Sequence, residues 1–172
     1  MLPGLRGIEH VGITVPDLEA AVAFFTGVLG CTRMFDGGAS GRPDFMERSL
    51  AVPREATMRY AFLRCANGPN LEVFEYTAPD QATEPPRNSD VGGHHLCFYV
   101  DDIEAAVAHL ASHGIETMGP VNTIAQGPAK GSSWVYFRAP WGLQLELVSF
   151  PAGKGDPDSP ARGLWRPDGV PG

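Results

Sequence analysis

Long apolar runs are absent from this sequence, and so is any leader of the secretory type. No stretch of the 172 residues approaches the roughly 20 consecutive apolar residues needed to cross a bilayer. The first residues, MLPGLRGIEH, lack the basic, apolar and small-residue succession of a signal peptide. We therefore expect a cytoplasmic protein that does not act in a membrane.

Basic charge is also scarce. The chain has 13 Lys and Arg against 20 Asp and Glu, a net charge of −7, and no basic cluster. Nucleic acids and anionic membrane surfaces are bound largely through Lys and Arg, so neither is expected as a partner. The sequence contains no GxGxxG, GxxxxGK[ST] or GxSxG motif, which removes dinucleotide-binding, P-loop and serine-hydrolase functions.

Cysteine is too rare to build a scaffold. The three residues Cys31, Cys65 and Cys97 are odd in number and far apart, and no CxxC knuckle occurs. This pattern supports neither a disulfide framework nor a cysteine metal site. We expect three buried, reduced thiols.

The chain does contain an internal repeat. GIEHVGITVPDLEAAVA near the start matches GGHHLCFYVDDIEAAVA when shifted by 85 positions, which places His10 on His95. A second shift, of 74 positions, lays residues 60–76 on residues 134–150 without a gap. Two modules of related sequence therefore make up most of the chain.

The second shift also pairs two acidic residues. YAFLRCANGPNLEVFEY lies on WVYFRAPWGLQLELVSF, so that Glu72 matches Glu146. Each module thus carries one histidine near its beginning and one glutamate near its end.

Hydrophobic periods indicate the same elements in both modules. IEHVGITV alternates as a strand does and places His10 on the face opposite Val11 and Ile13. Asp17 is suited to cap the helix that follows, and Asp102 repeats this role. Further strand-like runs complete each module. We predict an α+β fold of two β-α-β-β-β modules that pair into one cupped, partly closed mixed sheet.

The predicted segments differ in composition. The first module is eleven residues longer between its histidine and its glutamate, and the excess lies in a Gly- and Pro-rich stretch. We expect this stretch to be mostly loop, with a helical turn around DFMERSL, and it could be a lid or a plain solvated loop. The predicted boundaries are a first module 1–80 with a long loop 36–57, a linker 81–92, a second module 93–150 and a Pro/Gly-rich tail 151–172. In the tail, only Leu164 and Trp165 are expected to dock.

Other titratable residues near these motifs are expected to be structural. The alternation places His94 opposite His95, in the core or at a sheet edge. His109 and His113 have a spacing that can hold zinc, but they have no counterpart in the first module and should face solvent. Glu9 and Glu75 alternate away from the face of the histidine and glutamate. Arg64 and Arg138 could bind an anionic group, although their place before a hairpin turn equally suits a structural role.

The duplicated pattern resembles a known superfamily. A histidine on the first strand and a glutamate on the last strand of each module, with the strings HHL…VDD and APWGLQLEL, is similar to the vicinal oxygen chelate superfamily over residues 7–150. That superfamily includes glyoxalase I, methylmalonyl-CoA epimerase, extradiol dioxygenases and the fosfomycin and bleomycin resistance proteins. The resemblance implies that one divalent metal ion is shared by His10, Glu72, His95 and Glu146.

The donor set agrees with that implication on chemical grounds. Two neutral imidazoles and two carboxylates form a mixed nitrogen and oxygen set that suits Zn, Ni, Co, Mn or Fe(II). Among relatives of this kind, a glutamate of the metal site removes the substrate proton. The matching position here is Glu146, with Glu72 as its symmetric counterpart.

Three functional classes follow. The leading class is a metal-dependent lyase or isomerase of the glyoxalase I or epimerase type, which removes a proton beside a metal-chelated carbonyl. The alternatives are an Fe(II) or Mn ring-cleaving dioxygenase and a metal-free small-molecule-binding protein of the drug-resistance type. We expect a small-molecule substrate in a cup shaped by Phe74, Tyr99 and Tyr136, and we expect a homodimer.

Overall fold

The computed structural model describes residues 2–165 and 167 and divides the chain into two compact units, Met1–Thr83 and Glu84–Gly172. The division falls within residues 81–92, which form neither helix nor strand. Among the described residues, no helix has the length and apolar character that crossing a bilayer requires.

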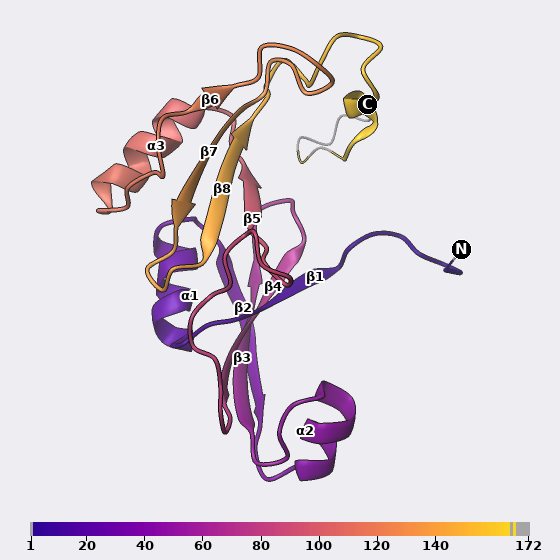
Figure 1. Ribbon diagram of the computed structural model, residues 1–172, viewed down its shortest axis with the longest axis vertical. Coiled ribbons are helices and arrows are strands. Elements are labelled where there is room, and N and C mark those ends of the chain that lie inside the picture. The colour runs from indigo at the N-terminus through magenta and orange to yellow at the C-terminus, as the bar shows by residue number, and fades with distance from the viewer. Residues whose placement is uncertain (1, 166, 168–172) are drawn as a thin grey trace. The chain divides into compact units, whose positions relative to one another are not determined.

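The first unit is a four-stranded mixed sheet with a helix packed on one face (Figure 1). Its spatial order is β1-β4-β3-β2, with β1 parallel to β4 and the other neighbours antiparallel. The elements are β1 (His10–Thr14), α1 (Leu18–Gly27), β2 (Thr32–Ala39), α2 (Pro43–Leu50), β3 (Thr57–Arg64) and β4 (Asn70–Thr77).

The second unit repeats this topology. Its sheet has the order β5-β8-β7-β6, again with one parallel pair, β5 with β8. The elements are β5 (Leu96–Tyr99), α3 (Ile103–Ser112), β6 (Asn122–Thr123), β7 (Ser133–Arg138), β8 (Gln144–Ser149) and the 3₁₀ helix η1 (Pro160–Gly163). The α+β class and the duplicated β-α-β-β-β module are confirmed. The strands form two four-stranded mixed sheets, one in each unit.

Both main helices begin as the sequence predicted. The Asp17 and Asp102 carboxylates each accept a hydrogen bond from the backbone N–H three residues on, at 2.9 and 3.0 Å. This satisfies one of the free donors of the first turn. Gly30 and Gly114, beyond the helix ends, have φ values of 73°, a region that glycine enters without strain.

Strand alternation decides which face of the first sheet is buried. On β1 and just after it, Ile13 and Val15 are only 4% and 2% exposed, whereas His10 is exposed. Ala21 and Phe25 of α1 are fully buried on the same side as these apolar residues. The histidine therefore leaves the apolar face, as the period of two predicted.

The stretch 36–57 is more ordered than the predicted long loop. Strand β2 continues to Ala39, and α2 lies between it and β3, where the sequence predicted a helical turn. Pro43 opens α2, where its missing N–H costs nothing, and Met46 is fully buried. Arg54 binds carboxylates of α2 on both Asp44 and Glu47. One buried apolar anchor and these two ion pairs help to order a Gly- and Pro-rich segment.

The tail docks through residues other than those expected. Leu164 and Trp165 are 57% and 65% exposed, so the prediction that they dock is wrong. Instead, the Gly155 N–H donates to the Lys130 carbonyl at 2.7 Å, and the Lys130 ammonium binds the Asp156 carboxylate at 2.9 Å. Polar backbone and side-chain contacts hold this segment, which hydrophobicity could not reveal.

The cysteines also depart from expectation. Cys31 and Cys65 form a disulfide, so the prediction of reduced thiols is wrong for this pair, and Cys97 is exposed instead of buried. The reason is sheet register. Thr32 lies opposite Arg64 in the antiparallel β2-β3 pair, so the residues that flank this pair are also neighbours, with a Cα separation of 4.6 Å.

Candidate functional site

One histidine and one glutamate of the first unit lie side by side. His10 begins β1, and β1 runs parallel to β4 with Gly12 opposite Glu72, so both side chains leave the same face of the sheet. The His10 Nε2 atom is 3.3 Å from the Glu72 Oε2 atom. The imidazole is 41% exposed and the carboxylate 18%. The pair is therefore open to solvent mainly through its histidine.

The second unit builds an equivalent pair. His95 directly precedes β5, whose Cys97 lies opposite Glu146 of β8. The His95 Nε2 atom is 3.0 Å from the Glu146 Oε2 atom, and the two side chains are 34% and 15% exposed. Both units thus place an imidazole Nε2 and a carboxylate oxygen in contact with nearly the same geometry.

An aromatic ring supports each histidine. The Phe62 ring meets the His10 ring edge-on, with centroids 5.5 Å apart, and the Tyr136 ring meets His95 in the same way at 5.2 Å. Phe62 and Tyr136 occupy matching positions 74 residues apart. The repeat therefore preserves the packing of the imidazole as well as the imidazole itself.

In the first unit the aromatic face continues beyond Phe62. Phe35 stacks on Phe62 at 4.7 Å, and Tyr60 lies between Phe62 and Phe74, at 6.0 and 5.7 Å. Gly37 makes room for this arrangement, because a Cβ atom there would lie 2.3 Å from the Tyr60 Cζ atom. The Glu72 face of the sheet is thus a wall of aromatic side chains.

The three residues expected to shape a cup have definite places. Phe74 shares the Glu72 face of β4, and Tyr136 lies against His95. Tyr99 contacts Phe150 at 4.7 Å. Phe74 therefore lies on the face of the first pair and Tyr136 contacts the histidine of the second, while the cup itself stays a prediction.

The surroundings shift the titration of two groups at these pairs. Burial raises the pKa of Glu72, and the Glu9 carboxylate adds to this effect, while His10 opposes it. Although Cys97 as a residue is exposed, neighbouring atoms shield its sulfur from water, and this loss of solvent, together with the adjacent Glu146 carboxylate, raises the pKa of Cys97 to about 12. The Cys97 thiol therefore stays protonated and donates to Glu146 at neutral pH.

Several supporting contacts were not predicted. The Glu9 carboxylate turns back from the face assigned to it and contacts the His10 Nδ1 atom. Asn70 donates to that carboxylate at 2.7 Å. In the second unit the Asn88 amide lies 3.4 Å from the His95 Nδ1 atom. Strand alternation determines the direction of each Cβ atom, but a long side chain at the end of a strand, such as Glu9, can still reach the other face.

The neighbouring titratable residues behave as structural ones. His94 is exposed, and its Nδ1 atom lies 3.1 Å from the backbone carbonyl two residues earlier, so it is not a core residue. His109 and His113 are exposed, as predicted. The Arg64 guanidinium donates to a backbone carbonyl of the following turn at 2.8 Å. Glu75 binds the start of α1 on the other side of the sheet.

The first unit also has a pocket of about 320 Å³ that does not include His10 or Glu72. It is bounded in part by Glu75, which projects from the opposite face of β4 to Glu72. It is therefore separate from the His10 and Glu72 pair. Its lining residues are Gly38, Ala39, Ser40, Thr57, Met58, Arg59, Glu75 and Thr77.

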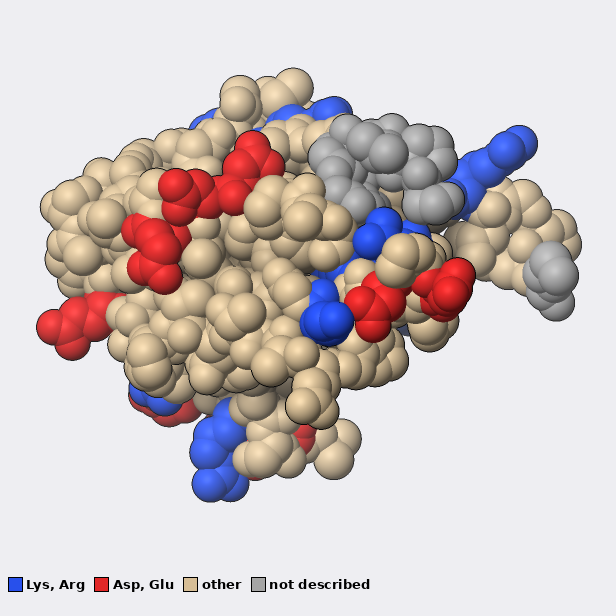
Figure 2. Space-filling view, turned by 90° about the horizontal axis from the view of Figure 1, so that it is seen from above, with Lys and Arg blue, Asp and Glu red and all other residues tan. Residues whose placement is uncertain are grey.

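The surface carries its charge in small groups. On the face in Figure 2, basic side chains lie in separate clusters, several of them beside acidic ones. The Arg33 guanidinium, for example, binds both Glu19 and Asp36 at 2.8 Å. In the first unit Arg33, Arg54 and Arg59 are thus engaged with neighbouring carboxylates.

The four predicted ligands occur as two pairs. Within residues 2–165 and 167, no group of three or more His, Cys, Asp or Glu is close enough together to hold a metal ion. Each unit contributes one imidazole and one carboxylate, so the four-residue ligand set stays a prediction.

Comparison with known proteins identifies the family. The model of the Glyoxalase/Bleomycin resistance protein/Dioxygenase superfamily matches residues 9–137. The chain belongs to this superfamily. A glyoxalase family protein from Enterococcus faecalis has a crystal structure that covers 84% of this chain and 98% of its own, with a TM-score of 0.61 and 26% identity.

Two relatives within the superfamily are epimerases. A 2-epi-5-epi-valiolone epimerase from Actinomyces sp is 46% identical over 98% of this chain and 92% of its own length. The mitochondrial methylmalonyl-CoA epimerase of Homo sapiens is 32% identical over 66% of this chain and 57% of its own length. These similarities support an enzyme of the epimerase or isomerase type.

Proposed function

We propose that this protein is a divalent-metal-dependent epimerase that inverts a carbon beside the carbonyl of a small ketone. The observation that carries the proposal is the equal geometry of the two pairs, in which each unit turns a histidine Nε2 toward a glutamate oxygen, at 3.3 and 3.0 Å. The similarity to an epimerase over almost the whole chain supports the reaction type.

The donor atoms fit a metal ion. Two ligands at right angles, each about 2.1 Å from a metal, are separated by about 3.0 Å, close to the spacing within each pair. His10 and Glu72 would be the ligands from the first unit, and His95 and Glu146 those from the second. When bound, such an ion would withdraw electrons from the substrate carbonyl and acidify the neighbouring C–H group.

The glutamates would move the proton. Inversion requires that a proton leaves one face of a carbon and returns to the other face, which two carboxylates can accomplish when each serves one face. We assign proton removal to Glu146, with Glu72 as the group that returns a proton. The protonated Cys97 thiol beside Glu146 would limit the freedom of that carboxylate.

The substrate class follows from the more similar relative. The name 2-epi-5-epi-valiolone denotes a ketone, and a similarity of 46% over 98% of this chain favours a ligand of that kind over a coenzyme A thioester. The aromatic wall around Phe74 and Tyr60 would offer ring faces to the apolar side of a cyclic substrate.

The test combines metal analysis with isotope exchange. Protein purified without chelator or metal resin should contain about one divalent ion per chain by elemental analysis. In D₂O it should epimerise 2-epi-5-epi-valiolone with deuterium incorporated beside the carbonyl, and methylmalonyl-CoA serves as the comparison substrate. Chelator treatment should abolish turnover, and the added ion should restore it.

Two outcomes would contradict the proposal. Full activity in the metal-free protein would remove the role of the ion and favour a metal-independent chemistry. Oxygen uptake with ring cleavage of a catechol, without epimerisation, would favour the dioxygenase alternative.

A further inference from the structure

The Glu9 side chain has no counterpart in the second unit. It lies directly before His10, and its carboxylate contacts the Nδ1 atom of that imidazole. The position 85 residues later is His94, whose ring turns to a backbone carbonyl instead. The two histidines are thus supported differently, although their Nε2 atoms face equivalent glutamates.

Asn70 holds Glu9 in place. Its amide donates to the Glu9 carboxylate at 2.7 Å and to the Glu9 carbonyl at 3.2 Å, and its own backbone N–H donates to that carbonyl at 3.1 Å. Asn70 also lies opposite His10 in the register of β1 and β4. Glu9 is therefore held by three contacts from one residue of the neighbouring strand, one to its carboxylate and two to its backbone carbonyl.

The chemistry of the contact determines the tautomer of His10. An ionised carboxylate only accepts hydrogen bonds, and Glu9 meets the Nδ1 atom with hydrogen-bonding geometry, so that atom carries the proton. Glu72 lies 3.3 Å from the Nε2 atom, an ion-pair distance without such a hydrogen bond, which leaves the Nε2 lone pair available. A neutral histidine in water prefers the opposite arrangement, with its proton on Nε2. The His95 Nδ1 atom faces the Asn88 amide at 3.4 Å, and an amide can either donate or accept. The second unit therefore lacks, among its described residues, a carboxylate that would hold the proton on the Nδ1 atom, while the Glu146 carboxylate lies 3.0 Å from the Nε2 atom of its histidine.

We propose that Glu9 is a positioning residue that holds His10 as the Nδ1-protonated tautomer and so prepares the first pair to bind a metal ion before the second pair. The tautomer part of this inference is independent of the proposed function, and the metal part rests on it. Carboxylates that bind the far nitrogen of a ligating histidine orient the ring and strengthen its metal bond.

The first measurement needs no metal. Nitrogen-15 NMR of the histidine side chains of the apo protein, at a pH of about 9 and thus above the usual histidine pKa of ~6.5, reports which nitrogen is protonated. His10 should show the Nδ1-protonated signature, assigned by its loss in His10→Ala. Glu9→Ala should shift His10 to the Nε2-protonated form, and Glu9→Gln should give an intermediate spectrum because an amide oxygen can still accept. Glu55→Ala, which removes another exposed glutamate of the first unit, should change nothing.

The second measurement is the affinity for Zn²⁺ or Co²⁺ by chelator competition. Glu9→Ala should weaken binding by about 10–100-fold, the range seen when such outer contacts are lost. Asn70→Ala should weaken it less, and His94→Ala should leave it unchanged.

The outcomes distinguish the positioning role of Glu9 from the proposed metal binding. If His10 keeps its tautomer in Glu9→Ala, the positioning role is wrong. If the tautomer changes while metal affinity does not, the preparation of the first pair is wrong. If the wild-type protein binds no metal but the tautomer depends on Glu9, the positioning role stands and the proposed metal function falls.

Discussion

The two units share a topology and a His–Glu pair, yet they secure that pair by different means. In the first unit Glu9 fixes the histidine, whereas in the second unit the Cys97 thiol contacts the glutamate. The first unit also has a disulfide and the additional helix α2. The comparison shows that two repeats can keep the same site residues while the side chains that contact those residues differ between the copies.

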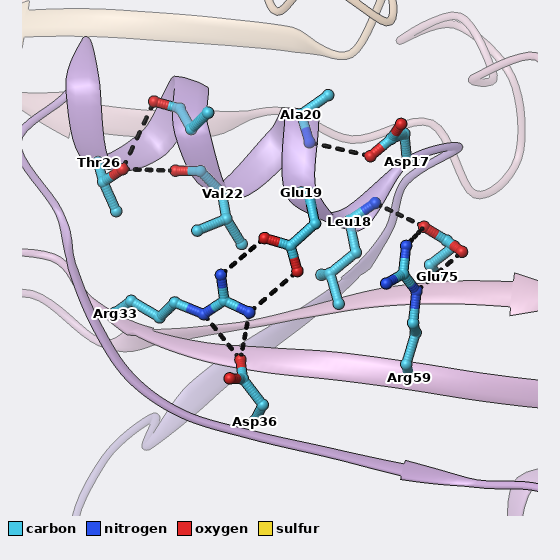
Figure 3. A network of polar contacts seen from close by, with 11 residues as sticks. Asp17, Leu18, Glu19, Ala20, Val22, Thr26, Arg33, Asp36, Arg59 and Glu75 are labelled. Carbon is cyan, nitrogen blue, oxygen red and sulfur yellow. Dashed lines mark hydrogen bonds and ion pairs between the residues drawn. The ribbon is translucent and has the colours of Figure 1, made fainter.

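The starts of the two helices show the same divergence. Glu75 accepts from the Leu18 N–H at 2.7 Å and binds Arg59 at 2.8 Å, as Figure 3 shows. At the matching position 74 residues later, Ser149 is buried and its hydroxyl donates to the Asp101 carbonyl at 3.1 Å. The first unit thus has an ionic contact at its helix start, where the second unit has a neutral hydrogen bond.

The largest expected effect is on catalysis, where the two matching glutamates, Glu72 and Glu146, should have different roles. Glu146→Gln should lower kcat by about 10²–10⁴-fold, since it removes the general base while the fold and some metal binding persist. Glu72→Gln should still exchange the substrate proton with D₂O but should not invert the carbon. Proton NMR of substrate in D₂O separates exchange from inversion, and circular dichroism with metal analysis controls for folding. Exchange retained in Glu146→Gln and lost in Glu72→Gln would reverse the assignment.

An intermediate effect concerns the cross-link that only the first unit has. The disulfide closes a loop with a sequence separation of 34 residues, which corresponds to roughly 3–4 kcal/mol from the restricted unfolded chain. Replacing both Cys31 and Cys65 with Ser should lower the free energy of unfolding by about that amount in urea titrations without reductant. Cys97→Ser is the control and should not alter the effect of reductant. Equal stability of the double variant and the wild-type protein would show that the bond does not form in solution.

The smallest expected effect is on stability and concerns the contacts at the starts of the two helices. The Arg59 guanidinium, together with the Leu18 N–H, holds the pKa of Glu75 below its ordinary value of 4.5. The stabilisation is therefore complete above that value and is lost as the pH falls through the lower pKa of the folded state. Glu75→Gln should cost about 1.5–3 kcal/mol at neutral pH and progressively less in acid.

Ser149→Ala provides the matched comparison. It should cost about 1 kcal/mol with no dependence on pH in this range, because the hydroxyl does not titrate. Thermal unfolding followed from neutral pH to about pH 3 measures both variants. Parallel pH profiles for the two variants would contradict the ionic role of Glu75.

Local patterns explain why the fold class was predictable. Short stretches of sequence reveal the strand alternation around His10 and the helix caps at Asp17 and Asp102. The two repeat shifts are found by direct comparison of such stretches. Pairing within each unit of His10 with Glu72, and of His95 with Glu146, then follows from the parallel first and last strands.

Features that depend on register or on long side chains were not predictable. The disulfide needs the β2-β3 register, which no local signal reveals. The turn of Glu9 toward His10 depends on Asn70 from a distant strand.

The contact of Gly37 with Tyr60 makes one position unusually well suited to laboratory evolution. Any side chain at residue 37 must displace the Tyr60 ring, because the added Cβ atom would lie 2.3 Å from its Cζ atom. The ring would then have to adopt another rotamer beside Phe62 and Phe74, which it now contacts. A small library at residue 37 would therefore vary the shape of the aromatic wall indirectly, while His10 and Glu72 keep their own side chains.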